Sequence, residues 1–266
     1  MPYLERDGAP DIHYDLDGQP PGERTGVVFF NGMTQTTEHW AGQAKMFGED
    51  FPVLRYDARG HGETTLGDHP VSMELHVEDV LQLLDHLDWS SAHFVGFSHG
   101  SRVALAAATR DAGRVDRLVL CSSTARPTAV ARTIIRSWRE VLESGGLEAM
   151  SWAALPSIIG NDYLDQNEQI LEGIVRASVG RNREEDVRAL LDAHADYPEQ
   201  AELAEQLDDI PTLVISAEED PLVDREGARK LADIAGGEHR HLDGVGHTVA
   251  IEAPETFHEV VDDFLE

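Results

Sequence analysis

Short, continuous apolar runs alternate with segments of helical periodicity along most of this chain, and this alternation limits the folds open to it. The runs Thr25–Asn31, Phe51–Asp57 and Ala92–Phe97 are typical of strands that are buried on both faces. The segment 72–87 places its apolar residues on one helical stripe, and Ser72 is its predicted N-cap. Strands that alternate with helices predict a mainly parallel sheet with right-handed crossovers.

The same rhythm continues to residue 123 and resumes at residue 209. The predicted strands cover 114–123, 210–220 and 238–244, and the predicted helices cover 101–110, 224–235 and 254–266. Pro254 suits the first turn of the closing helix. Near the start, the alternating segment 11–18 ends in an Asp-Gly pair, which predicts an antiparallel hairpin at the edge of the sheet.

Between residues 124 and 208 the strand pattern stops. Four segments with helical spacing follow one another there, over 128–146, 147–159, 167–180 and 183–197. We therefore predict a core domain of residues 1–123 and 209–266, with residues 124–208 inserted into it as a helical cap.

Acidic residues dominate the charge of the chain: 50 Asp and Glu stand against 21 Lys and Arg among 266 residues, a formal net charge of -29. Such a surface repels nucleic acid and anionic membranes, so neither is an expected partner. The excess of acid and the scarcity of lysine (Lys45 and Lys230) resemble proteins from salt-loving organisms. Because counterions screen this self-repulsion, we expect a stability that rises with salt.

The sequence has no apolar stretch of membrane-spanning length, and its first residues lack the basic and apolar regions of a secretory signal. Its one cysteine, Cys121, allows no internal disulfide and lies in an apolar run, where a core position is expected. These features favour a cytoplasmic protein, either a monomer or a homodimer.

The pentapeptide Gly96-Phe97-Ser98-His99-Gly100 lies between a predicted strand and a predicted helix, the context that the G-x-S-x-G motif requires. The two glycines permit a turn so tight that a side chain at either position would collide with backbone. Such a turn exposes the Ser98 hydroxyl as a nucleophile and leaves the His99 N–H free to bind an oxyanion. The alternative is a serine that is merely small at an ordinary turn.

A serine nucleophile needs a base, and His247 is the predicted one because it lies in a glycine-rich loop between the last strand and the last helix. A carboxylate must hold that imidazole in the productive tautomer. Asp220, in the loop after an apolar strand, is the predicted acid. Glu218, Glu219 and Asp224 compete with it in this acidic stretch.

The loop after the first buried strand supplies the second predicted oxyanion donor, the N–H of Met33. Gly32 lets the backbone turn there and is itself an expected substrate contact. The cap is expected to roof the site, with Trp138 and Trp152 facing the substrate. Cap arginines are candidates to offset the negative charge near the pocket: Arg126, Arg132 and Arg136.

The chain resembles the α/β-hydrolase superfamily, and within it the small, cap-bearing branch of 3-oxoadipate enol-lactonases, carboxylesterases and cofactor-free haloperoxidases. The resemblance rests on four segments: "YDARGHGET", "GFSHG", "SAEEDPLV" and "GVGHTVAIEAPETFHEVVDDFL". It implies an α/β-hydrolase fold, with a mainly parallel, eight-stranded sheet flanked by helices and a helical cap. Two residues depart from the family pattern: Asn31 replaces a usual histidine, and His99 replaces a usual apolar residue.

The resemblance implies a serine hydrolase that cleaves a small or medium ester or lactone through the three predicted residues, without a cofactor. C–C bond hydrolysis, thioester hydrolysis and perhydrolysis by the same residues are alternatives, and so is a non-catalytic ligand-binding protein. Asp57, Arg59 and His61 lie in a segment that is a structural turn in the family, so no metal site is predicted there.

Overall fold

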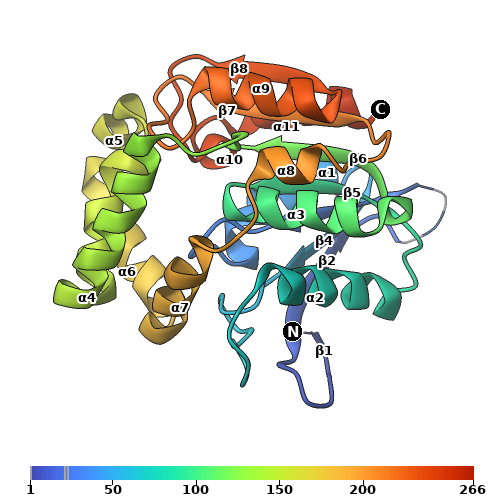
Figure 1. Cartoon of the computed structure of the whole chain (residues 1–266), viewed down its shortest axis with the longest axis horizontal. Coiled ribbons are helices and arrows are strands. Elements are labelled where there is room, and N and C mark those ends of the chain that lie inside the picture. Colours follow the sequence, from blue (N-terminus) through green and yellow to red (C-terminus); the bar gives the residue numbers. More distant parts are fainter. Residues whose placement is uncertain (1, 21, 23) are drawn as a thin grey trace.

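A computed structural model of the chain describes residues 2–20, 22 and 24–266. Within these residues, eight strands form one sheet in the order β1-β2-β4-β3-β5-β6-β7-β8 (Figure 1). The strands are β1 Tyr3–Leu4, β2 Ile12–Gly18, β3 Gly26–Phe30, β4 Pro52–Tyr56, β5 Ala92–Phe97, β6 Val115–Cys121, β7 Thr212–Ala217 and β8 Glu238–Leu242. From β4 to β8 along the sheet all neighbours are parallel, which confirms the predicted mainly parallel sheet.

The edge of the sheet at β1 and β2 is antiparallel, as expected. The Asp-Gly pair that ends β2, however, does not turn the chain directly into a neighbouring strand of the sheet. β2 pairs with β1 before it and with β4, and it does not form a hairpin with β3. The reason lies in the sheet order, since β4 and β5 occupy both sides of β3 and leave it no free edge.

Helices cover both faces of the sheet. Helices α1 (Ala41–Phe47) and α11 (Pro254–Leu265) pack on the face that receives Phe29, and the opposite face receives Phe30. The helices on that opposite face are α2 (Met73–His86), α3 (His99–Arg110), α8 (Gln200–Ala204) and α9 (Arg225–Ala235). Successive strand residues thus feed two separate cores, which is why the strands read as unbroken apolar runs.

Local signals place the ends of these helices. Ser72 caps α2 as predicted, because its side chain accepts a hydrogen bond from the Leu75 N–H at 3.4 Å. Pro254 occupies the first turn of α11. The short helices are η1 Thr37–Trp40, η2 Ala112–Arg114, η3 Glu168–Ile170 and α10 Val249–Glu252.

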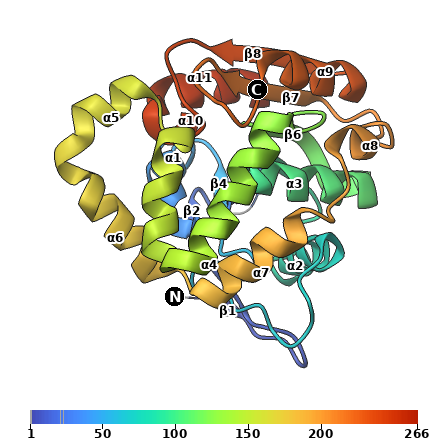
Figure 2. The same cartoon turned by 60° about the vertical axis from the view of Figure 1, so that its left-hand side comes forward.

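Four helices gather at the end of the sheet shown on the left of Figure 1: α4 (Ala129–Ile158), α5 (Asn161–Asn167), α6 (Leu171–Arg181) and α7 (Glu184–His194). The two helices predicted over 128–159 form one run with a break at Gly146, where φ is 78°. Figure 2 shows both halves of α4 crossing in front of the sheet, beside α6 and α7. The division into core and cap at residues 124 and 208 stays a prediction; α8, inside those bounds, packs on α3 and α9.

Cys121 lies fully buried in β6, which confirms its predicted core position. Burial raises the pKa of its thiol to about 12, so this side chain is an inert packing group. None of the described helices combines the length and the apolarity that a bilayer crossing needs.

Candidate active site

The turn between β5 and α3 holds Ser98 in a strained conformation, with φ 51° and ψ -112°. Both neighbouring glycines are sterically required. A Cβ on Gly96 would lie 2.6 Å from the Ser101 Cα, and one on Gly100 would lie 2.6 Å from the Asn31 carbonyl oxygen. The turn leaves Ser98 partly exposed at the carboxyl end of the parallel strands, where open α/β sheets bind ligands.

The structure brings Ser98, His247 and Asp220 together from three separate loops. The Nε2 atom of His247 lies 2.9 Å from the Ser98 Oγ, and its Nδ1 atom lies 2.7 Å from the Asp220 Oδ2. Asp220 and His247 are both buried. Because the carboxylate only accepts hydrogen bonds, it places the proton on Nδ1 and leaves the Nε2 lone pair facing the serine hydroxyl.

Asp220 is held in this orientation by backbone on its other side. Its Oδ1 atom accepts hydrogen bonds from the N–H groups of Leu222 and Val223, at 2.8 and 3.1 Å. The competing acids have other partners. Glu218 accepts from the Gly244 N–H, Glu219 from the Asn161 N–H, and Asp224 caps α9. Asp220 is therefore the acid of this loop that faces the imidazole.

The loop that carries His247 is fixed by residues that sequence reasoning missed. The Ser122 hydroxyl donates a 2.6 Å hydrogen bond to the His247 carbonyl oxygen. The Glu252 carboxylate accepts from the N–H groups of Gly246 and Thr248 at 2.9 and 3.1 Å, and from the Thr248 hydroxyl at 2.7 Å. A serine following β6 was visible in the sequence, but its partner 125 residues away was not.

The turn after β3 places Met33 in the lining of the same cavity. The N–H of Gly32 donates to the Gln35 side chain at 3.0 Å, and its carbonyl accepts from the Gln35 N–H at 3.0 Å. A Cβ on Gly32 would lie 2.5 Å from the Phe97 ring. Met33 lines the cavity and Gly32 does not, so the cavity lining does not support the expected contact between Gly32 and the substrate.

Asn31 and His99 are the two departures from the family pattern; the Asn31 side chain has a structural role, whereas His99 lines the cavity. The Asn31 amide donates to the Tyr56 carbonyl at 2.8 Å and so ties the ends of β3 and β4 together. His99 opens α3, where the first N–H groups have no acceptor within the helix. Its imidazole is buried against the rings of His61, His76 and Tyr197, with centroids 5.1 to 5.8 Å away, and burial lowers its pKa well below the usual value.

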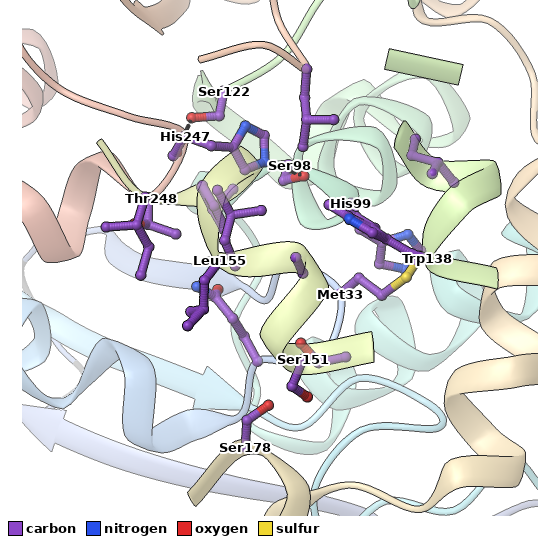
Figure 3. A pocket seen from close by; sticks show the side chains of 18 of the residues that line it. Met33, Ser98, His99, Ser122, Trp138, Ser151, Leu155, Ser178, His247 and Thr248 are labelled. Atoms are coloured by element: carbon purple, nitrogen blue, oxygen red, sulfur yellow. Dashed lines mark hydrogen bonds between the residues drawn. The ribbon is translucent and has the colours of Figure 1, made fainter. Parts of the chain in front are cut away.

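A cavity of about 450 Å³ opens beside Ser98, roofed mainly by apolar side chains of α4 and α6. Trp138, Met150 and Leu155 line it. Figure 3 shows Met33, His99 and Trp138 on the side of Ser98 away from His247. The prediction for Trp152 is wrong: its side chain is 41% exposed and lies outside the cavity. On α4 the inward stripe runs through Ser151, Ala154 and Leu155 instead, and Trp152 points away from it.

The three cap arginines predicted to offset charge also lie outside the cavity. Arg126 pairs with Glu202 at 3.4 Å, Arg132 donates to the Pro127 carbonyl, and the Arg136 side chain is 81% exposed.

Asp57 and Arg59 organise the turn after β4. The Asp57 carboxylate accepts from the Thr37 N–H at 2.8 Å and from His13 at 2.8 Å, and Arg59 binds Asp79 with two hydrogen bonds of 2.6 and 2.9 Å. Across the part of the chain that the structure describes, no group of three His, Cys, Asp or Glu side chains has the arrangement of a metal site.

Comparison with known proteins identifies the family of this chain. The model of the family described as "Serine aminopeptidase, S33" matches residues 22–254. The chain is 28% identical to the "Putative carbamate hydrolase RutD" of Caulobacter sp. strain K31, over 96% of this chain and 95% of the relative. Among solved structures, the enol-lactonase from Burkholderia xenovorans LB400 matches with a TM-score of 0.89 and 30% identity over 99% of both chains.

A second solved structure is equally similar in shape. MGS-M2, an α/β hydrolase enzyme from a Medee basin deep-sea metagenome library, matches with a TM-score of 0.90 and 25% identity over 99% of this chain and 96% of that one. The eight-stranded sheet with helices on both faces agrees with the similarity to these solved hydrolase structures. The chain is therefore an α/β-hydrolase and belongs to the family described as Serine aminopeptidase, S33.

Proposed function

We propose that this protein is a serine hydrolase that cleaves a small or medium carboxylic ester or lactone. The observation that carries the proposal is the continuous hydrogen-bonded chain from the Ser98 hydroxyl through His247 to Asp220, which opens onto a largely apolar cavity. Each member has the position that its role demands: the hydroxyl accessible, the imidazole between, and the carboxylate buried and fixed.

In the first half of the reaction, Ser98 Oγ forms a bond with the substrate carbonyl carbon while its proton moves to His247 Nε2. The N–H groups of Met33 and His99 bind the negative oxygen of the tetrahedral intermediate. The bond from carbon to the leaving oxygen then breaks, and His247 gives its proton to that oxygen. Asp220 stabilises the imidazolium that exists between these two proton transfers.

In the second half, water attacks the acyl-serine. His247 takes one proton from the water as the new carbon–oxygen bond forms, and returns it to Ser98 Oγ as the ester bond breaks. The products are the carboxylic acid and the regenerated hydroxyl. All proton transfers run through one imidazole, so the chain's own residues suffice for the cycle.

The apolar roof and the resemblance to a named enol-lactonase support a compact acyl or lactone substrate. A carbamate is a second candidate, because several relatives that cover 96% of this chain are named as carbamate hydrolases. Both substrates present a carbonyl carbon to the same nucleophile, and a carbamate differs from an ester by the nitrogen bonded to that carbon.

The test compares wild type with Ser98→Ala on p-nitrophenyl acetate and butyrate, in 1 M KCl. We expect kcat/KM to fall at least 10³-fold in the variant, because the nucleophile is lost while the fold is kept. Ser101→Ala is a matched control: its buried hydroxyl donates to the Cys121 carbonyl, one helical turn from the site. Equal rates for wild type and Ser98→Ala would refute the proposal.

A panel with a lactone, a thioester, a carbamate and a β-diketone then separates the reaction types that the same three residues support. A non-catalytic binding protein would instead bind one of these compounds saturably and turn over none of them.

A further inference from the structure

Arg102 lies one helical turn after Ser98 on α3 and lines the same cavity. Ser98 precedes the helix as its N-cap, and four helical residues rise about 6 Å along the axis. The residue is only 6% exposed, yet it reaches the cavity beside His194. Sequence reasoning missed this position, since an arginine in an Ala-rich helix is usually a surface residue.

The guanidinium has no anionic partner. Its Nη1 donates to the His194 Nε2 at 3.1 Å, and its Nε is buried without a hydrogen-bond partner. Burial lowers the pKa of His194 to about 3, so that imidazole is neutral and does not compensate the charge. Burial lowers the pKa of Arg102, and the charge of Glu199, whose buried Oε2 has no hydrogen-bond partner, acts against this from a distance. Among the described residues no carboxylate lies within ion-pairing range of the guanidinium.

An unpaired buried guanidinium is costly, and proteins pair such charges or use them to bind ligands. The charged residues that line the cavity support the same conclusion. Although the chain carries 50 acidic residues, no Asp or Glu of the described part lines the cavity, while Arg102 and Arg181 do. The charged side chains that line the cavity are therefore positive, whereas the molecule as a whole is strongly negative.

We propose that Arg102 binds a carboxylate of the substrate, so that the ester or lactone cleaved here is an anion whose carboxylate lies a few carbons from the reacting carbonyl. The inference rests on the proposed function, since it names the substrate class of the same site. Arg102 presents the fixed fork of donors that carboxylates bind. The distance of one helical turn suits an acyl chain of succinate or glutarate length.

The decisive experiment compares two substrates of similar size: p-nitrophenyl butyrate, and the mono-p-nitrophenyl ester of glutarate. Both are measured in 1 M KCl, where the Debye length is about 3 Å and surface repulsion is screened. Wild type should prefer the glutarate ester. In Arg102→Met, which keeps an unbranched side chain but removes the guanidinium, kcat/KM for that ester should fall about 10- to 100-fold, as expected for a charged hydrogen bond. Butyrate turnover should change less than 3-fold.

Arg136→Met is the control, since Arg136 is an exposed arginine of α4 that lies outside the cavity. It should leave the ratio of the two substrates within 3-fold of wild type. If kcat/KM falls equally for both substrates in Arg102→Met, the residue only holds α3 against α7 and the proposal is refuted. An unchanged kcat/KM for the glutarate ester would also refute it. If Arg102→Met does not fold, binding to Ser98→Ala decides: monomethyl glutarate must bind at least 10-fold tighter than methyl butyrate.

The two proposals fail separately. Loss of the serine hydrolase proposal appears as equal butyrate turnover in wild type and Ser98→Ala. Loss of the carboxylate proposal appears as butyrate turnover that needs Ser98, with no preference for the glutarate ester.

Discussion

Replacing Asp220 with asparagine tests how the imidazole is held. Asparagine offers one acceptor oxygen where aspartate offers two, and the N–H groups of Leu222 and Val223 both require that oxygen. The amide nitrogen must then face His247 Nδ1, where the carboxylate oxygen now lies at 2.7 Å. Since an amide NH₂ only donates, Nδ1 must become the acceptor and the proton moves to Nε2. In that tautomer Nε2 cannot take the proton of Ser98.

The opposite amide orientation keeps the productive tautomer but leaves two buried N–H groups facing an NH₂. Each unsatisfied group costs about 1–3 kcal/mol, so this orientation is rarely populated. The imidazolium also loses its neighbouring negative charge. We expect kcat to fall about 10³- to 10⁴-fold, as in other serine hydrolases with this change. This is about 4–5.5 kcal/mol of transition-state stabilisation.

The measurement is kcat and KM on p-nitrophenyl butyrate for Asp220→Asn, with Asp224→Asn as the control. Asp224 lies four residues further along the same loop and caps α9, a role that asparagine fills equally well. The control should stay within 3-fold of wild type. Because Asp220 does not touch the substrate, KM should change little. A fall in kcat below 10-fold, with the melting temperature preserved, would refute the proposed role of the carboxylate.

Three further predictions follow from packing, burial and charge. Gly100→Ala should lower the free energy of unfolding by about 1–3 kcal/mol, because its Cβ would lie 2.6 Å from a backbone oxygen that cannot move aside; denaturation with urea measures it, and an unchanged midpoint would contradict the contact. Burial lowers the pKa of His76 to about 3 from its ordinary value of 6.5. Between these two pH values the unfolded chain binds a proton at His76 and the folded chain does not, so the free energy of unfolding decreases as the pH falls from 6.5 toward 3. Between pH 7.5 and pH 5, wild type should lose about 2 kcal/mol more than His76→Phe does, and equal losses in the two proteins would show that this histidine is not the cause. The melting temperature should rise between 0.1 and 2 M KCl as the net charge of -29 is screened, and a higher midpoint at low salt would refute that expectation.

The sequence allowed the sheet and the three residues of the hydrogen-bonded chain to be predicted for one physical reason. Parallel strands end at a common edge, so residues that follow separate strands meet there however far apart they are in sequence. Ser98, Asp220 and His247 each follow a strand. The two glycines that flank the turn at Ser98 could be predicted equally well, because a tight turn restricts residue type directly.

The lining of the cavity could not be predicted in the same way. Trp138 and Trp152 are 14 residues apart, and an uninterrupted helix would place them on nearly the same face. The break at Gly146 removes that phase relation, and only Trp138 faces the cavity. Arg102 was missed for a different reason: whether a guanidinium is paired depends on which side chains α7 brings near it, and periodicity carries no such information.

The strained turn at Ser98 also affects how this protein should be engineered. Serine is among the best N-cap residues, yet the Ser98 hydroxyl makes no cap to α3 and turns to His247 instead. Its backbone holds angles that cost a non-glycine residue about 1–3 kcal/mol. A library screened for melting temperature alone would therefore favour glycine at this position and enrich folded, robust and inactive molecules. Any thermostability campaign on this chain needs an activity screen in every round.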